Sequence, residues 1–123
     1  MAHTFEKRVF MGAGIYGVLA LLPQYFMETQ LGIDFPPPLT HPEHFYGFIG
    51  VALAWQLAFF ILAGDIKRYR PLMLPAIFEK LSFGVAALVL YALGRTGALI
   101  AGAGVLDLVF AGLFLLAFRA SRD

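Results

Sequence analysis

The sequence predicts an all-α membrane protein, a bundle of four transmembrane helices with both termini in the cytoplasm. Of its 123 residues, 60% are hydrophobic and only 14% are charged, whereas about 25% of the residues of a soluble domain are charged. The apolar residues form four runs of about twenty residues, the length that a helix needs to cross about 30 Å of hydrocarbon. Basic residues flank these runs mostly on one side, as the positive-inside rule requires of a membrane protein.

The four predicted spans form a single domain that covers the whole chain. They run over residues 9–27, 45–63, 72–93 and 97–118, and an outer loop over residues 28–44 joins the first two. The first run follows the polar stretch "HTFEKR" and contains Pro23. We interpret it as a span rather than a signal peptide, because no Ala-x-Ala cleavage pattern interrupts it and three further spans follow.

The other spans have start and stop signals of their own. The second begins after "LTHPE", in which Thr40 and Glu43 have capping-box spacing and Pro42 suits a first helical turn. The segment "GDIKRYRP" links the second span to the third. The short "GRT" turn predicts that the third and fourth spans are antiparallel neighbours.

Charge placement predicts the orientation and excludes some functions. The basic residues predicted on the cytoplasmic side are Lys7, Arg8, Lys67, Arg68, Arg70, Arg119 and Arg122, with Arg95 alone on the outer side. Both termini are therefore expected inside. A net charge of +1 gives no reason to expect a nucleic-acid partner, and the absence of cysteine excludes disulfides and thiolate metal sites.

The glycine-rich stretch "GAGIYG", residues 12–17, has the spacing of a dinucleotide-binding fingerprint. That fingerprint requires a preceding strand, and here it lies inside a span. Small residues in membrane helices let neighbouring backbones approach, so we expect helix packing instead. The small residues predicted to serve this purpose are Ala13 and Gly17, then Gly50, Ala54 and Ala58, and finally Ala98, Gly102 and Gly104.

His41 and His44 are weak candidates for a metal site in the outer loop. They are three residues apart with Glu43 between them, and imidazole is a common metal ligand. A closed metal site needs at least a third ligand, and none is evident nearby. We favour a helix cap with solvated histidines, and we predict no metal and no cofactor.

The third span places a glutamate beside a lysine in a membrane-spanning run. Counted from the span midpoints at about 1.5 Å per residue, Glu79, Lys80 and Gln56 lie within about 5 Å of the bilayer midplane. The fourth span is centred near Asp107. A charged side chain at a helix centre costs about 2.5–3.5 kcal/mol, so these groups are expected to meet one another or a cavity.

From depth alone, we predict that Lys80 pairs with Asp107 and that Glu79 pairs with Gln56 or Tyr16. Two interpretations of this polar layer stay open. It either fixes the helix register, at about 0.6–2 kcal/mol per contact, or forms a ligand or proton site. The residues of that predicted site are Glu79, Lys80, Asp107, Gln56, Trp55 and Tyr16. The aromatic residues that could wall an apolar pocket around it are Trp55, Phe59, Phe60, Phe78 and Phe83.

Three stretches, "GIYGVLALLPQYF", "HPEHFYGFIG" and "RYRPLMLPAIFEK", resemble the small DoxX-like membrane proteins of bacteria. The resemblance covers the whole length as four short spans with a glycine-rich first helix. It implies a helical bundle in the bacterial cytoplasmic (inner) membrane. The DoxX-like proteins that have an assigned role are small subunits linked to membrane redox or oxidant-defence complexes. It implies no catalytic residue.

Three functions are compatible with these features. The first is a binding or accessory protein that holds a lipid-like or quinone-like molecule at the polar layer, or joins a larger membrane complex. The second is an oligomeric transporter with Glu79 or Asp107 as a proton-coupled carboxylate, which would need at least a dimer. The third is a lipid isomerase that uses the same acids. We prefer the first, with the bilayer, a hydrophobic small molecule and a second copy or a larger complex as its partners.

Overall fold

A computed structural model describes residues 2–122, and these are helical almost throughout. The four long helices are α1 (Thr4–Leu21), α3 (Pro42–Gly64), α5 (Met73–Ala92) and α6 (Ala98–Ala120). Short helical segments connect them: η1 (Leu22–Phe26), α2 (Glu28–Asp34), α4 (Ile66–Tyr69) and η2 (Arg70–Leu72). The predicted all-α class is therefore confirmed.

Four helical stretches are long and apolar enough to cross a membrane. They are Thr4–Phe26, Pro42–Gly64, Ile66–Ala92 and Ala98–Ala120, which overlap the four spans predicted from the sequence. The first begins earlier than predicted, because the polar residues before Val9 already belong to α1. The loop between the first two stretches, predicted to face outward, also contains a helix, α2, that the sequence analysis missed. It is tied to α3 by the Tyr46 hydroxyl, which donates a hydrogen bond of 2.9 Å to Glu28 Oε1.

The predicted capping box at the start of α3 is wrong. The helix begins at Pro42, so that His41 rather than Thr40 is the N-cap residue, and no side chain caps it. The expected place of Pro42 in the first turn is confirmed.

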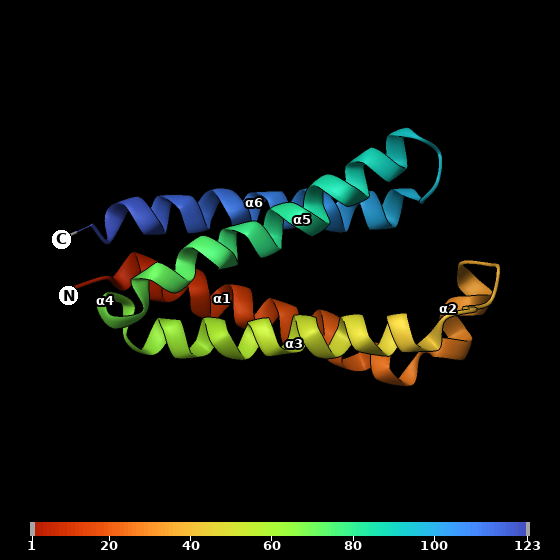
Figure 1. Cartoon of the computed structure of the whole chain (residues 1–123), viewed down its shortest axis with the longest axis horizontal. Coiled ribbons are helices and arrows are strands. Elements are labelled where there is room, and N and C mark those ends of the chain that lie inside the picture. The colour runs from red at the N-terminus through yellow and green to blue at the C-terminus, as the bar shows by residue number, and fades with distance from the viewer. Residues whose placement is uncertain (1, 123) are drawn as a thin grey trace.

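The bundle consists of two helix pairs. Helix α1 packs along α3, α5 packs along α6, and contacts between α1 and α6 join the pairs. Both chain ends and α4 lie at one end of the bundle, here called the termini end, and α2 and the turn at 93–97 lie at the other, the loop end (Figure 1). The predicted antiparallel pairing of the third and fourth spans is confirmed, with Gly94 at φ +72° in the turn.

Within each pair, the two helices approach each other most closely at glycine residues. A Cβ at Gly84 of α5 would lie 2.9 Å from the carbonyl oxygen of Gly104 in α6, and a Cβ at Gly14 of α1 would lie 2.6 Å from the Phe60 ring in α3. Small residues thus bring the helices together, as predicted for Ala13, Gly17 and Gly104, which are buried. Gly50 and Ala58 are partly buried, whereas Ala54, Ala98 and Gly102 are exposed and do not pack against another helix of this chain.

Large aromatic side chains fill the termini end. Phe114 stacks on Phe10 with ring centroids 4.3 Å apart and meets Phe59 edge-on at 5.1 Å, and all three are fully buried. The remaining buried members of this cluster are Ala13, Leu62, Ala63, Ile66, Met73, Ala76 and Ala117. These contacts join all four long helices at this end of the bundle.

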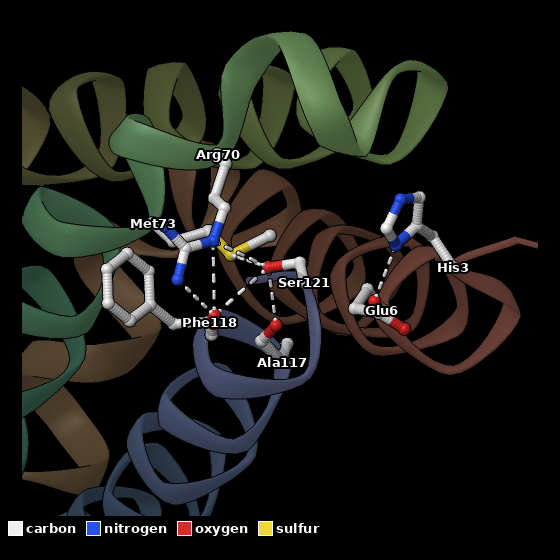
Figure 2. Close-up of polar contacts among 7 residues, drawn as sticks. All are labelled: His3, Glu6, Arg70, Met73, Ala117, Phe118 and Ser121. Carbon is white, nitrogen blue, oxygen red and sulfur yellow. Dashed lines mark hydrogen bonds and ion pairs between the residues drawn. The ribbon is translucent and has the colours of Figure 1, made fainter. Parts of the chain in front are cut away.

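Polar contacts close the same end (Figure 2). The Arg70 guanidinium donates hydrogen bonds to the Phe118 carbonyl oxygen, at 2.6 Å from Nη2, and to the Ser121 hydroxyl, at 3.1 Å from Nε. It also lies 3.9 Å from the centroid of the Phe118 ring. At the start of α1, Nδ1 of the N-cap residue His3 lies 2.8 Å from an oxygen of the buried Glu6. Arg70 therefore satisfies carbonyl and hydroxyl groups at the C-terminal end of α6.

Candidate functional site

Lys80 lies at the centre of the bundle, where α3, α5 and α6 face one another. It is only 3% exposed. Its Nζ lies 3.7 Å from Asp107 Oδ1, so the predicted Lys80–Asp107 pair is confirmed, and 3.7 Å from Glu79 Oε1. The ammonium also lies 5.4 Å and 5.5 Å from the ring centroids of Phe59 and Phe110, within cation–π range.

The predicted partners of Glu79 are wrong. Its carboxylate reaches back to Lys80, its neighbour in sequence, and makes no hydrogen bond to Gln56 or Tyr16 in the described structure. The prediction for Glu79 considered only the direction in which side chains leave the helix, which differs by about 100° between adjacent residues. It did not allow for the length of the lysine side chain, which can bend toward both carboxyl groups. The Lys80 amino group therefore contacts two carboxyl groups.

Gln56 places a second kind of polar group in the same layer. It is 1% exposed, and its Nε2 donates a hydrogen bond of 2.7 Å to the Ala52 carbonyl oxygen. That bond fixes the orientation of the amide, because a flipped amide would put two oxygens together. Its Oε1 is buried without a hydrogen-bond partner, as is Glu79 Oε1. There is room for the Gln56 side chain only because Gly17 has none, since a Cβ there would overlap Oε1.

These side chains line a cavity of about 190 Å³ between the four long helices, here called the central cavity. Its walls include Gln56 from α3, Glu79 and Lys80 from α5, Asp107 from α6 and Tyr16 from α1. Five of the six residues predicted as a ligand or proton site are thus brought together. Trp55 is the exception and lines a neighbouring cavity instead.

Two further cavities adjoin the central one. The side cavity, about 410 Å³, lies between α3 and α5 and shares Phe48, Ala52, Glu79 and Phe83 with the central cavity. The loop-end cavity, about 700 Å³, shares Ala20, Gln24 and Ile100 with it. The central cavity therefore adjoins one cavity toward the side of the bundle and another toward its loop end.

The predicted aromatic wall is only partly found. Phe83 lines the central and side cavities, and Trp55 and Phe78 line the side cavity. Phe59 is instead part of the packed core at the termini end, and Phe60 packs against Gly14.

The sequence analysis missed Phe48, Ala52, Gln24 and Ile100 as wall residues. Nothing in an apolar run marks which of its residues borders a space, although Gln24, a polar residue at the end of the first span, was a usable signal.

His41 and His44 lie apart from the polar layer. Both are exposed at the start of α3, where their rings stack with centroids 5.2 Å apart, and His41 Nδ1 is 3.5 Å from Glu43 Oε2. Across the described residues 2–122, no group of three or more histidine or acidic side chains is placed to hold a metal ion.

No protein-family model, curated protein or solved structure matches this chain. Functional inference therefore rests on the geometry of the central cavity.

The layer offers hydrogen-bond donors and acceptors side by side. Both Lys80 ion-pair distances, 3.7 Å, are longer than the about 2.7–3.2 Å of a direct N–H···O bond, so the ammonium keeps donor capacity for another acceptor. Gln56 Oε1 and Glu79 Oε1, which have no hydrogen-bond partner, are acceptors. A group that both donates and accepts hydrogen bonds, such as a hydroxyl, is the complement of this arrangement.

Proposed function

We propose that this protein is an integral membrane protein with both termini in the cytoplasm, and that it binds a lipid-like or quinone-like small molecule at the polar layer. The observation that carries the proposal is the central cavity, lined by Lys80, its two carboxylate partners and the buried Gln56. The expected location in a bacterial cytoplasmic membrane rests on the DoxX-like resemblance. The orientation rests on the basic residues of the termini end.

If the polar layer had only a structural role, its side chains would be expected to form direct hydrogen bonds with one another. Polar residues that only hold membrane helices together form direct hydrogen bonds across the interface, and a buried acceptor without a partner is costly. Here Gln56 Oε1 has no hydrogen-bond partner, and Glu79 Oε1 has no hydrogen bond and only the 3.7 Å ion pair to Lys80. The ion pair between Lys80 and Asp107 is equally long. The layer is thus incompletely satisfied at the place where it lines a cavity, as expected of a binding site.

Ligand retention tests the proposal. The protein would be released gently from its own membranes and weighed by native mass spectrometry, as wild type and as Lys80→Gln, Gln56→Leu and Leu81→Met variants. We expect a discrete bound mass that is lost in the first two variants. Leu81 is the matched control, because it is exposed on α5 next to Lys80 and its replacement should leave the bound mass unchanged.

Bare wild-type protein, or a bound mass that persists in both Lys80→Gln and Gln56→Leu, would contradict the proposal. Either result would favour the layer as a device that fixes helix register.

A further inference from the structure

We propose that the ligand is a single-chain amphiphile that occupies two cavities at once, its small polar head in the central cavity and its apolar chain in the side cavity between α3 and α5. The molecule would then be taken up sideways from the bilayer rather than from water at the loop end. This inference rests on the proposed binding function and adds the class of ligand and its route.

The helix packing explains why the bundle is open between α3 and α5. Glycines draw α3 toward α1, where Gly17 faces Gln56, and draw α5 toward α6, where Gly84 faces Gly104. Each helix is thus held by its own partner, and α5 runs obliquely to α3 (Figure 1). Between them lie the rings of Phe48 and Phe83, whose centroids are 6.3 Å apart.

The side cavity has the lining that a hydrocarbon chain requires. Its walls are mainly aromatic and aliphatic: Phe48, Val51, Ala52, Trp55, Pro75, Phe78 and Phe83, with Glu79 and Ser82 as the polar members. Val51 and Phe78 are 65% and 72% exposed on the outside of the bundle, where lipid chains would surround them. An apolar chain can therefore lie between this lining and the bilayer.

The central cavity limits the head to a small group. Its volume is about 190 Å³, and an apolar cavity of about 150 Å³ holds one benzene molecule. One hydroxylated ring, or a polar group of similar size, fits beside Lys80 and Gln56. Glu79 borders both cavities, so the head would meet this carboxylate first and the junction between head and chain would lie beside it.

The loop-end cavity is the competing route. It is larger, and its walls include Arg95, Thr96 and the α2 region from Met27 to Leu39. Its lining contains none of the four polar residues Gln56, Glu79, Lys80 and Asp107, whereas the side cavity includes Glu79. The side cavity is therefore the one of the two that shares a charged residue of the polar layer with the central cavity.

Photolabelling tests the route on unmodified protein. The probe is a long-chain para-alkylphenol with a diazirine in its chain, added to the protein in lipid vesicles, and the labelled residues are mapped by peptide mass spectrometry. We expect labels at Val51, Trp55 and Phe78. Both Lys80→Gln and Gln56→Leu should weaken probe binding about 5- to 100-fold, as expected when a hydrogen bond in a buried site is lost.

The outcomes separate the two proposals. Labels on residues 27–39 that still depend on Lys80 and Gln56 would overturn the lateral route but keep the binding site. Labels that ignore both substitutions, or labelling that excess unlabelled phenol does not reduce, would overturn the binding function and this inference together.

A cross-link supplies an independent measurement, and the absence of cysteine makes it free of background. Joining Phe48→Cys to Phe83→Cys with a bifunctional thiol reagent should slow probe exchange about tenfold or more. The matched control joins Leu31→Cys to Leu99→Cys across the loop-end cavity, whose lining includes both residues, and neither residue lines the central cavity. Exchange slowed by the control bridge and not by the first would overturn the lateral route.

Discussion

The two ends of this bundle are built from the same four helices, yet one is filled and the other is hollow. At the termini end, the rings of Phe10, Phe59 and Phe114 are fully buried and contact one another. Toward the loop end, the buried apolar cluster is reduced to Leu21, Ile49 and Ala52, and cavities lie between the helices. The polar layer lies between these two regions.

The difference follows from the size of the inward-facing residues. On α6, Phe114 and Phe110 face the filled end, whereas Ala103 and Gly104 are at the level of the central cavity. Helices in a membrane gain no hydrophobic driving force from pairing, so van der Waals packing decides where they are held tightly. We infer that stability is concentrated at the termini end and binding near the polar layer.

The largest expected loss of stability comes from opening the filled end. Phe114→Ala removes a ring that contacts Phe10 and Phe59, and should lower the free energy of unfolding by about 3–5 kcal/mol. The matched control is Phe78→Ala, whose ring is 72% exposed and should change stability far less. Thermal or denaturant unfolding in a mild detergent measures both. Equal losses would remove the contrast between the two regions.

The next effect tests the glycine contact that holds α5 to α6. A side chain at Gly84 would meet Leu108 at 2.7 Å and the Gly104 carbonyl oxygen at 2.9 Å, so Gly84→Leu should destabilise the bundle by about 1–3 kcal/mol or more. Gly102, on the same pair of helices, has open space where its Cβ would be, and Gly102→Leu is the control. A tolerated Gly84→Leu in the same unfolding measurement would mean that the helices can separate without cost.

A smaller loss is expected where Arg70 caps α6. Arg70→Met removes the hydrogen bonds to Phe118 and Ser121 and should cost about 1–2 kcal/mol. Lys67→Met removes a positive charge from the exposed neighbouring helix α4 and serves as the control. If both variants unfold alike, net charge rather than the cap accounts for the effect.

Much of this architecture could be predicted from the sequence, because it depends on the length of apolar runs and on the position of charged residues within them. Apolar run length gave the four long helices, and the position of ionisable residues along those runs gave the depth of Lys80 and Asp107 and hence their pairing. The partner of Glu79 depended on side-chain conformation, which spacing does not encode. The capping box failed because His41 rather than Thr40 is the N-cap residue of α3.

The cavities were beyond prediction for a related reason. Gly17 and Gly102 look alike in the sequence, yet one faces Gln56 and the other open space. Which side of a helix faces inward depends on how all four helices pack, and the helices are apolar on every side, so periodicity carries little information.

The variant with the smallest expected effect on stability, Ala103→Leu, distinguishes most directly between residues needed for folding and residues needed for binding. Ala103 lines the central cavity, so Ala103→Leu would fill space rather than displace packed atoms, and the free energy of unfolding should stay level or rise by up to about 1 kcal/mol. The same leucine should exclude the polar head, so the bound mass seen by native mass spectrometry should disappear. Gly112→Leu, at an open position of the same helix, should leave that mass in place. If a stable Ala103→Leu variant retained the bound ligand, the polar head would lie elsewhere. If the variant lost the ligand without losing stability, the binding region would be distinct from the filled end that stabilises the bundle.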